Sequence, residues 1–341
     1  MPNPSPDSSP DASPDASPDA SPAPTPSVPG RPGAAHAVVV GGGTMGADVA
    51  VVLTRALCRT TIVEPDPGRA GALPARVRAN LAMIGRDAGA QRLAVVATLD
   101  AVDWTSVDLV IECIPEDLAL KQALFAELVA RARPHTLLAS NSSSFPISAI
   151  GAGLDTRERM LGLHFFMPAH LVPLVEVVMG EASAEGHADA LAAFMRRCGM
   201  VPVKVRKDLP GFLANRLQHA LSREAFSLID RGIASPEDVD AAVRFGFGFR
   251  FLAAGPVLQR DHAGIDVHAA AGATMYPTFC NDDHPARCLS ERAADGRHGM
   301  KRGEGFYAWT PETIAAERAR YDHLLRAGLA LIAPELPEIQ P

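Results

Sequence analysis

The stretch VVVGGGTMG, residues 38–46, decides the fold that we predict for this chain. Three valines indicate a buried strand, and Gly41, Gly43 and Gly46 follow it in G-x-G-x-x-G spacing, ahead of a helix-like sequence. In such a turn the first glycine permits the tight bend, the second lets the backbone approach a diphosphate, and the third lets helix and strand pack closely. The helix start then offers free N–H groups to an anion. The predicted loop consists of Gly41, Gly43, Thr44, Met45 and Gly46.

An acidic residue follows at the spacing that a dinucleotide site needs. Glu64 ends a second predicted strand, residues 60–65, and lies 23 residues after Gly41. A carboxylate there accepts hydrogen bonds from ribose hydroxyls and repels a 2′-phosphate. The pattern therefore predicts NAD rather than NADP as the cofactor.

The rest of the chain divides into three predicted parts. Residues 1–33 hold 11 of the 29 prolines and few apolar residues, which predicts a disordered tail. Residues 34–208 alternate apolar runs with helical stretches, which indicates a doubly wound α/β domain with a parallel sheet. Residues 209–341 read as helices alone, which predicts a separate all-α domain. Further strands are expected at residues 35–41, 108–114, 136–143, 160–166, 174–180 and 201–206.

Bulk properties exclude several partners. The net charge of −7 disfavours nucleic acid and anionic membranes, which need a basic face. The chain has no apolar run of about 18 residues and no secretory signal, so we expect it in the cytoplasm. Five cysteines without CxxC spacing are typical of reduced thiols, and the histidines lack metal-ligand spacing, so no metal site is expected.

The candidate chemistry lies in the run LGLHFFMPAH, residues 161–170. His164 sits among apolar residues, and Glu176 lies in the next apolar strand, where an unpaired carboxylate is costly. A His–Glu pair across neighbouring strands resolves both anomalies and prepares the imidazole to act as a base. Ser143 and Asn215 are further candidates. By pattern alone, a turn with helix-capping serines explains the run around Ser143 better, and an exposed amide remains open for Asn215.

Two features of the last third are expected to pack in the helical domain. A helix beginning near Pro210 carries an apolar stripe that includes Leu213, Leu217 and Leu221. A segment rich in glycine and phenylalanine, residues 245–251, is expected to bend and to pack in a core.

Seven segments, in this order and at these separations, resemble the L-3-hydroxyacyl-CoA dehydrogenase family. The resemblance runs from about His36 to the segment HGMKRGEGFYAW near residue 309. It implies an NAD-binding Rossmann domain, a helical domain that closes the cleft, a homodimer, and a role in fatty acid metabolism. The segments are VVVGGGTMG, VEPD, IPEDLALKQALF, SNSSS, GLHFFMP, LVPLVEVV and LPGFLANR.

The resemblance also implies roles by position. His164 matches the general base, Glu176 its carboxylate partner, and Ser143 the hydroxyl that binds the substrate oxygen. Asn215 matches the asparagine that completes the site from the helical domain. The residues that match the lining of the cofactor's ribose and nicotinamide side are Glu116 and Lys121.

Two departures from the family leave the substrate open. Met167 stands where the family commonly has asparagine, and residues 68–92 contain arginines but no lysine to hold CoA phosphates. The segment from Gly211 to Phe251 is also similar to lambda-crystallin, L-gulonate dehydrogenase and pyridine-carboxylate dehydrogenases, whose substrates lack CoA. The main expectation is an NAD-dependent 3-hydroxyacyl-CoA dehydrogenase. The alternatives are a dehydrogenase of a free hydroxy acid or alcohol, and a non-catalytic, crystallin-like NAD-binding protein.

Overall fold

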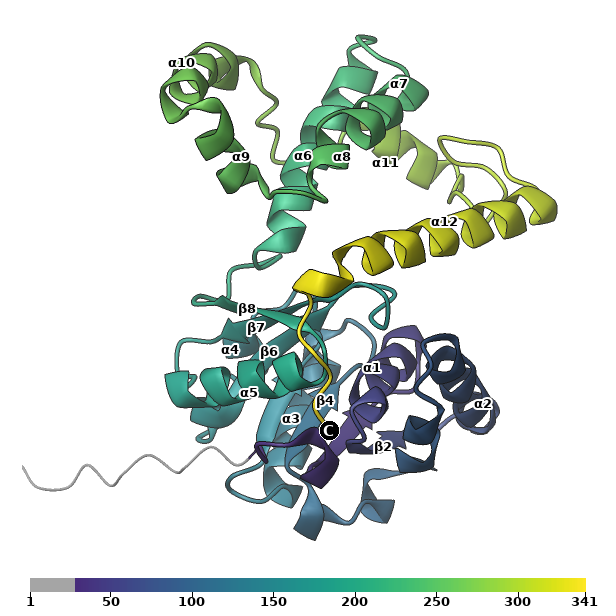
Figure 1. Cartoon of the computed structure of the whole chain (residues 1–341), viewed down its shortest axis with the longest axis vertical. Helices are drawn as coiled ribbons and strands as arrows, with labels where there is room; N and C mark the ends of the chain where they lie inside the picture. The colour runs from purple at the N-terminus through teal and green to yellow at the C-terminus, as the bar shows by residue number, and fades with distance from the viewer. Residues whose placement is uncertain (1–27) are drawn as a thin grey trace, which may run out of the picture.

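The computed structural model describes residues 28–341 and has two parts. Figure 1 shows a sheet with helices on both faces and, above it, a group of helices reached through α6. Most of the predicted disordered tail lies outside the described residues. Its last part, residues 28–33, is not a free tail, because Val28 and Pro32 are buried and Arg197 donates a hydrogen bond to the carbonyl of Gly30.

The first domain is built on one eight-stranded sheet with the order β3-β2-β1-β4-β5-β6-β7-β8. Strand order reverses between β1 and β4, which is where ligands bind in doubly wound folds. The strands are β1 His36–Val40, β2 Arg59–Val63, β3 Leu93–Val96, β4 Leu109–Glu112, β5 Leu137–Ser140, β6 Met160–Phe165, β7 Leu174–Met179 and β8 Val201–Val205.

The predicted doubly wound parallel sheet is confirmed, with one exception: β7 runs antiparallel to β6. Only residues 166–173 join these two strands, whereas a parallel crossover needs about a dozen residues or more. The chain therefore turns straight back, and β8 then pairs parallel with β7. The edge strand β3 was not predicted from the sequence, because it is short and largely half-buried.

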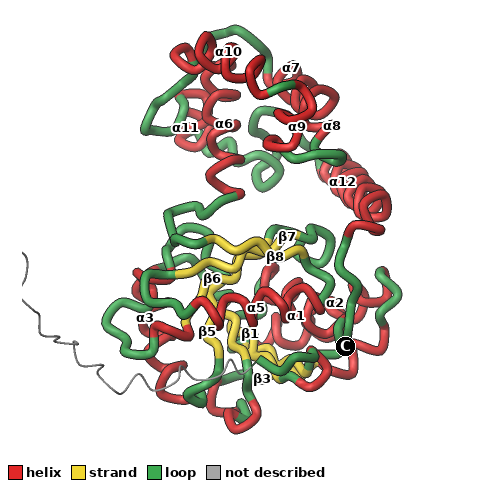
Figure 2. Tube along the Cα trace, turned by 60° about the vertical axis from the view of Figure 1, so that its left-hand side comes forward, coloured by secondary structure: helices red, strands yellow, loops and turns green. Residues whose placement is uncertain are grey.

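Both faces of the sheet are covered, which explains the continuous apolar runs of its central strands. Along β1, Ala37 and Val39 belong to the core on one face, and Val38 and Val40 to the core on the other. Figure 2 shows the helices flanking the strands. The first face is covered by α1 Thr44–Arg55, α2 Pro67–Met83 and α5 Glu185–Arg197, and the second by α3 Leu118–Arg131 and α4 Ile147–Ile150.

The second domain is helical, but it leaves apolar side chains exposed. The helix α6 begins at Ala214 rather than near Pro210, and its leucine stripe is not buried: Leu217 is 58% exposed. The segment of residues 245–251 is kinked at Gly246, as expected. Phe245, however, is 75% exposed, so the prediction that this segment packs in a core is wrong. The helices are α6 Ala214–Asp230, α7 Pro236–Ala241, α8 Gly248–Arg250, α9 Pro256–Ala263, α10 Ile265–Met275, α11 Arg287–Ala294 and α12 Pro311–Ile332.

The end of the chain returns to the first domain. After α12, the C-terminal residues run back down to the sheet domain, as Figure 1 shows in yellow. Gln340 N donates to the carbonyl of Arg197 at 2.9 Å, and Ile339 packs against the core on the first face of the sheet. These last residues, which the sequence assigns to the helical domain, therefore contact the sheet domain.

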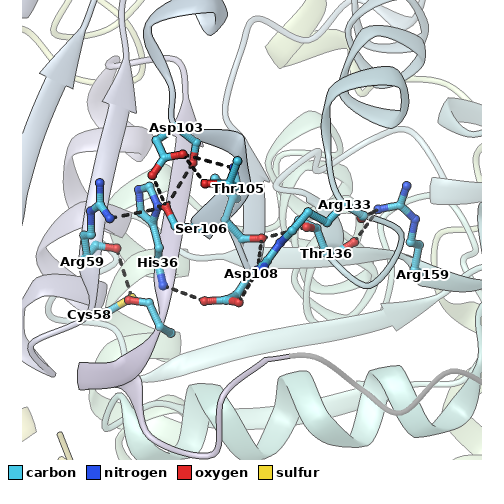
Figure 3. A network of polar contacts seen from close by, with 12 residues as sticks. His36, Cys58, Arg59, Asp103, Thr105, Ser106, Asp108, Arg133, Thr136 and Arg159 are labelled. Carbon is cyan, nitrogen blue, oxygen red and sulfur yellow. Dashed lines mark hydrogen bonds and ion pairs between the residues drawn. The ribbon is translucent and has the colours of Figure 1, made fainter.

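A polar network lies at the amino-terminal ends of β1 and β4, on the side of the sheet opposite the glycine loop (Figure 3). His36 lies at its centre, with Nδ1 3.0 Å from Ser106 Oγ and Nε2 2.9 Å from Thr61 Oγ1. The backbone N–H of His36 donates to Asp108, which in turn accepts from Arg133. Burial lowers the pKa of His36 to about 4, so the imidazole is neutral near pH 7.

Candidate active site

The glycine loop has the geometry that its spacing predicts. Gly41 adopts a φ of 102°, which favours glycine, and a Cβ on Gly46 would lie 1.8 Å from the carbonyl oxygen of Gly41. A Cβ on Gly43 would meet no atom within 4 Å, so this backbone is open to a ligand. No side chain caps α1, which leaves the N–H groups of its first turn, at Thr44 and Met45, for an anion.

Glu64 lies directly after β2 and faces this loop. Its Oε2 accepts from Gly42 N at 2.9 Å, and its Oε1 accepts from Arg69 Nη2 at 3.0 Å. Burial alone would raise the pKa of Glu64, but these hydrogen bonds and the charge of Arg69 outweigh it and lower the pKa. The carboxylate is therefore ionised beside the place expected for a ribose.

A second group of charges lies at the end of β4. Lys121 is almost fully buried, and its Nζ lies 2.7 Å from Glu112 Oε1 and 3.2 Å from Glu116 Oε2. Glu116 accepts in turn from Ser142 Oγ at 2.5 Å and from Ser144 N at 2.9 Å. These residues adjoin a cavity of about 350 Å³, whose lining also includes Met45 and Ser143.

Ser143, His164 and Glu176 form a row of hydrogen bonds. Ser143 Oγ lies 3.0 Å from His164 Nε2, and His164 Nδ1 lies 2.7 Å from Glu176 Oε2. The pairing of β6 with β7 sets His164 directly opposite Glu176. Both side chains are buried, at 4% and 0% exposure, so the pair is shielded from water.

Glu176 also holds the start of the helical domain. Its Oε1 accepts from Leu213 N at 3.1 Å and from Ala214 N at 2.8 Å. Burial alone would raise the pKa of Glu176, but the hydrogen bonds from His164 and from these backbone groups outweigh it and lower the pKa. An ionised carboxylate thus joins the imidazole to the first turn of α6.

Asn215 follows Ala214 but makes no hydrogen bond to His164 or Ser143 in the part of the chain that the structure describes. It lines a separate cavity of about 600 Å³ in the helical domain, between α6 and the loop before α11. Arg216 and Arg223 line the same cavity. The structure therefore brings Ser143, His164 and Glu176 together, whereas Asn215 lines a different cavity.

Glu112 was missed by the sequence reasoning, although a signal for it existed. It is a carboxylate inside the apolar run DLVIECI, and its side chain is completely buried. Glu112, like Glu176, is a charged side chain in an apolar strand, where it needs a partner. Among the described residues, no group of three or more His, Cys, Asp or Glu side chains is placed to hold a metal ion.

The residues at this sheet edge fit NAD. The open backbone at Gly43 and the uncapped start of α1 suit a diphosphate, and Glu64 suits the adenosine ribose. The cavity beside Glu116 and Lys121 extends from the loop toward Ser143, and so toward the His–Glu pair.

Family models match most of the described chain. The 3-hydroxyacyl-CoA dehydrogenase NAD-binding domain matches residues 36–209, and the 3-hydroxyacyl-CoA dehydrogenase C-terminal domain matches residues 211–309. No helix in the part of the chain that the structure describes is long and apolar enough to cross a membrane.

Individual relatives agree with these matches. The chain is 32% identical over 290 residues to 5-formyl-3-hydroxy-2-methylpyridine 4-carboxylate 5-dehydrogenase of Mesorhizobium japonicum, covering 83% of this chain and 94% of that protein. It is 31% identical to human mitochondrial hydroxyacyl-coenzyme A dehydrogenase, covering 80% of this chain and 91% of that one. It is 35% identical to 3-hydroxyadipyl-CoA dehydrogenase of Escherichia coli, of whose length it spans 59%.

Solved structures give the same result. A crystal structure of the pyridine-carboxylate 5-dehydrogenase, described as an NAD⁺-dependent dismutase, superposes with a TM-score of 0.81 over 87% of this chain and 98% of that chain, at 31% identity. The (S)-3-hydroxybutyryl-CoA dehydrogenase of Ralstonia eutropha superposes with a TM-score of 0.67 over 81% of this chain and 99% of that chain, at 28% identity. The chain belongs to the 3-hydroxyacyl-CoA dehydrogenase family and is an NAD-dependent oxidoreductase.

Proposed function

We propose that this dehydrogenase oxidises the secondary hydroxyl at the 3-position of a 3-hydroxyacyl-CoA, or of a related 3-hydroxy acid, to a ketone. The observation that carries the proposal is the hydrogen-bonded row of Ser143, His164 and Glu176 at the end of the cofactor cavity. A buried imidazole with a carboxylate on one nitrogen and a hydroxyl on the other is arranged to move a proton.

His164 acts as the general base. Because Glu176 accepts from Nδ1–H, the lone pair is on Nε2, and this nitrogen takes the proton of the substrate hydroxyl. Glu176 then supports the imidazolium that forms. When bound, NAD supplies the acceptor for the hydride that leaves the same carbon. In the reverse direction His164 returns the proton to the oxygen.

Ser143 and Asn215 position the reacting oxygen. The hydroxyl of Ser143 is within hydrogen-bonding distance of the same Nε2 that receives the proton, so it reaches the substrate oxygen as well. Asn215 approaches from the start of α6 and donates from its amide when the two domains enclose the substrate. Such preorganised donors stabilise charge that develops on the oxygen.

The test is a spectrophotometric assay of the purified protein. Absorbance at about 340 nm follows NADH while acetoacetyl-CoA and unesterified 3-oxo acids are compared as substrates. We expect turnover with His164 intact, and a loss of about 10³-fold or more in kcat for His164→Ala with unchanged NADH binding. NADH binding without turnover across the whole panel would instead support the non-catalytic, crystallin-like alternative.

A free hydroxy acid is the second candidate substrate, and the ion pairs made by two of the three arginines of α2 favour it. Arg69 pairs with Glu64 and Arg76 pairs with Asp48, so neither is free to hold a CoA phosphate. In the helical domain, Arg216 and Arg223 line the cavity beside Asn215 and have no carboxylate partner among the described residues. Asp282 and Asp283 line the same cavity, so the support for an anionic substrate is the two unpaired guanidinium groups and not a net positive charge.

We also propose a homodimer. The exposed apolar side chains of the helical domain, such as Leu217 at 58% and Phe245 at 75% exposure, support it, because a monomer rarely leaves so many uncovered. Light scattering after size exclusion tests the mass. We expect twice the mass of one chain, and a shift toward the single-chain mass for Phe245→Ser with Phe249→Ser.

A cytoplasmic location is part of the same proposal. All five cysteines of the chain are free, which supports a reducing compartment. Fractionation of cells that express the full chain tests the location.

A further inference from the structure

Glu112 ends the central strand β4, between the glycine loop and the serine loop. It pairs with Val40 of β1 on one side and with Ser140 of β5 on the other. Its side chain is 0% exposed, yet both oxygens are bonded: Oε1 accepts from Lys121 Nζ and from Ile114 N, each at 2.7 Å, and Oε2 accepts from Ser140 Oγ at 2.5 Å. The donors around it therefore satisfy the hydrogen-bonding capacity of this buried carboxylate.

Lys121 extends this contact to the cofactor cavity. Its ammonium lies between Glu112 and Glu116, at 2.7 Å and 3.2 Å from their carboxylate oxygens. Burial would raise the pKa of Glu116, but the hydrogen bond from Ser142 and the charge of Lys121 outweigh it, so the pKa is lowered. The site thus contains two carboxylates and one ammonium, which leaves one net negative charge.

The nicotinamide end of NAD belongs beside this group. Glu64 marks the adenosine end over β2, and the diphosphate belongs at the glycine loop between β1 and β4. The other end of the dinucleotide therefore extends over β4 and β5 toward His164. The cavity on that path is lined by Glu112, Glu116 and Lys121.

We propose that Glu112, Lys121 and Glu116 form a charge triad whose net negative charge stabilises oxidised, cationic nicotinamide relative to reduced, neutral nicotinamide. Glu112 is a positioning residue in it: it fixes Lys121 and contributes charge without a contact to substrate. The nicotinamide ring is positive in NAD⁺ and uncharged in NADH, so nearby charge acts on only one of the two forms. The inference rests on the proposed function only for placing the nicotinamide near His164.

The experiment measures two dissociation constants without any substrate. NADH binding is followed by its fluorescence and NAD⁺ binding by calorimetry. For Glu112→Gln, which removes one negative charge, we expect the ratio Kd(NAD⁺)/Kd(NADH) to rise about tenfold, or about 1.4 kcal/mol. For Lys121→Met, which adds net negative charge, we expect it to fall. The double variant has the wild-type net charge and should return toward the wild-type ratio.

The opposite signs separate charge from structure, because damage to the site weakens both cofactor forms together. Glu127→Gln is the matched control. It removes an exposed carboxylate from α3, the helix that carries Lys121, and should leave the ratio unchanged. If Glu112→Gln does not fold, Glu116→Gln carries the test with the same expected direction. The triad is overturned if Kd(NAD⁺)/Kd(NADH) is the same in all variants as in wild type. It is also overturned if Glu112→Gln and Lys121→Met shift this ratio in the same direction. Absence of turnover with the expected shifts overturns only the proposed function.

Discussion

The carboxylate of Glu176 accepts a hydrogen bond of 2.8 Å from the backbone N–H of Ala214, the first residue of α6. Its other oxygen holds His164 at 2.7 Å. One buried side chain of the sheet domain therefore orients the proposed base and also fixes the helix that carries Asn215. Glu176 therefore links the orientation of the proposed base to the position of the helical domain.

We predict that Glu176→Gln lowers kcat by about 10²–10⁴-fold, because the amide NH₂ cannot accept from Nδ1–H and favours the wrong tautomer. The dissociation constant of NADH should stay within about threefold of wild type, since Glu176 does not face the glycine loop. Stopped-flow kinetics and NADH fluorescence give the two values. An unchanged kcat would remove Glu176 from the mechanism.

The glycine loop allows structural and ligand-binding roles to be separated. Gly43→Ala places a methyl group where the protein has no atom within 4 Å, so the free energy of unfolding should change by less than about 1 kcal/mol. The same methyl group enters the space proposed for the diphosphate, and the dissociation constant of NADH should rise at least about tenfold. Gly71→Ala, also in open space but inside α2, is the control: it should leave the dissociation constant unchanged and raise the free energy of unfolding by up to about 1 kcal/mol, because alanine favours a helix.

Gly46→Ala should behave differently. Its Cβ would lie 1.8 Å from the carbonyl oxygen of Gly41, so α1 has to move away from the loop. Stability and cofactor affinity should therefore fall together. Equal stability for the Gly43 and Gly46 variants would contradict the packing role of Gly46.

The sequence was sufficient for features that depend on local spacing or on a costly buried charge. The glycine loop, Glu64, and the contact between His164 and Glu176 all appear where the pattern predicts them. Features that depend on long-range pairing did not follow from it. The direction of β7 is determined by the shortness of one connection, and the packing of Ile339 joins residues far apart in the chain.

The exposure of Phe245 shows another limit. Hydrophobic spacing indicates that a side chain will be covered, but it does not indicate whether its own domain or a second chain covers it.

Protonation of His36, which lies in the network shown in Figure 3, should make the free energy of unfolding depend on pH. Its pKa is lowered from 6.5 to about 4 by burial and by the charge of Arg59, so the folded state binds a proton less readily than the unfolded state. The stabilisation is complete above about pH 6.5 and is lost as the pH falls toward 4, by about 3 kcal/mol in total. Urea unfolding at pH 7 and pH 5 measures it. His36→Gln should lose less stability over this interval than wild type; equal losses would contradict the prediction.

The cavity that Asn215 lines predicts how the enzyme distinguishes a free hydroxy acid from its neutral ester. Arg223 lies eight residues after Asn215 on α6, about 12 Å along the helix axis, and both residues line the cavity. If a carboxylate of a free hydroxy acid binds there, Arg216→Gln and Arg223→Gln should each raise KM for the acid about tenfold and leave KM for its neutral methyl ester unchanged. Arg231→Gln, at the end of the same helix and outside the cavity, is the control. An equal rise for acid and ester would show loss of shape rather than of charge recognition, and a rise for acetoacetyl-CoA alone would assign the two arginines to the CoA phosphates.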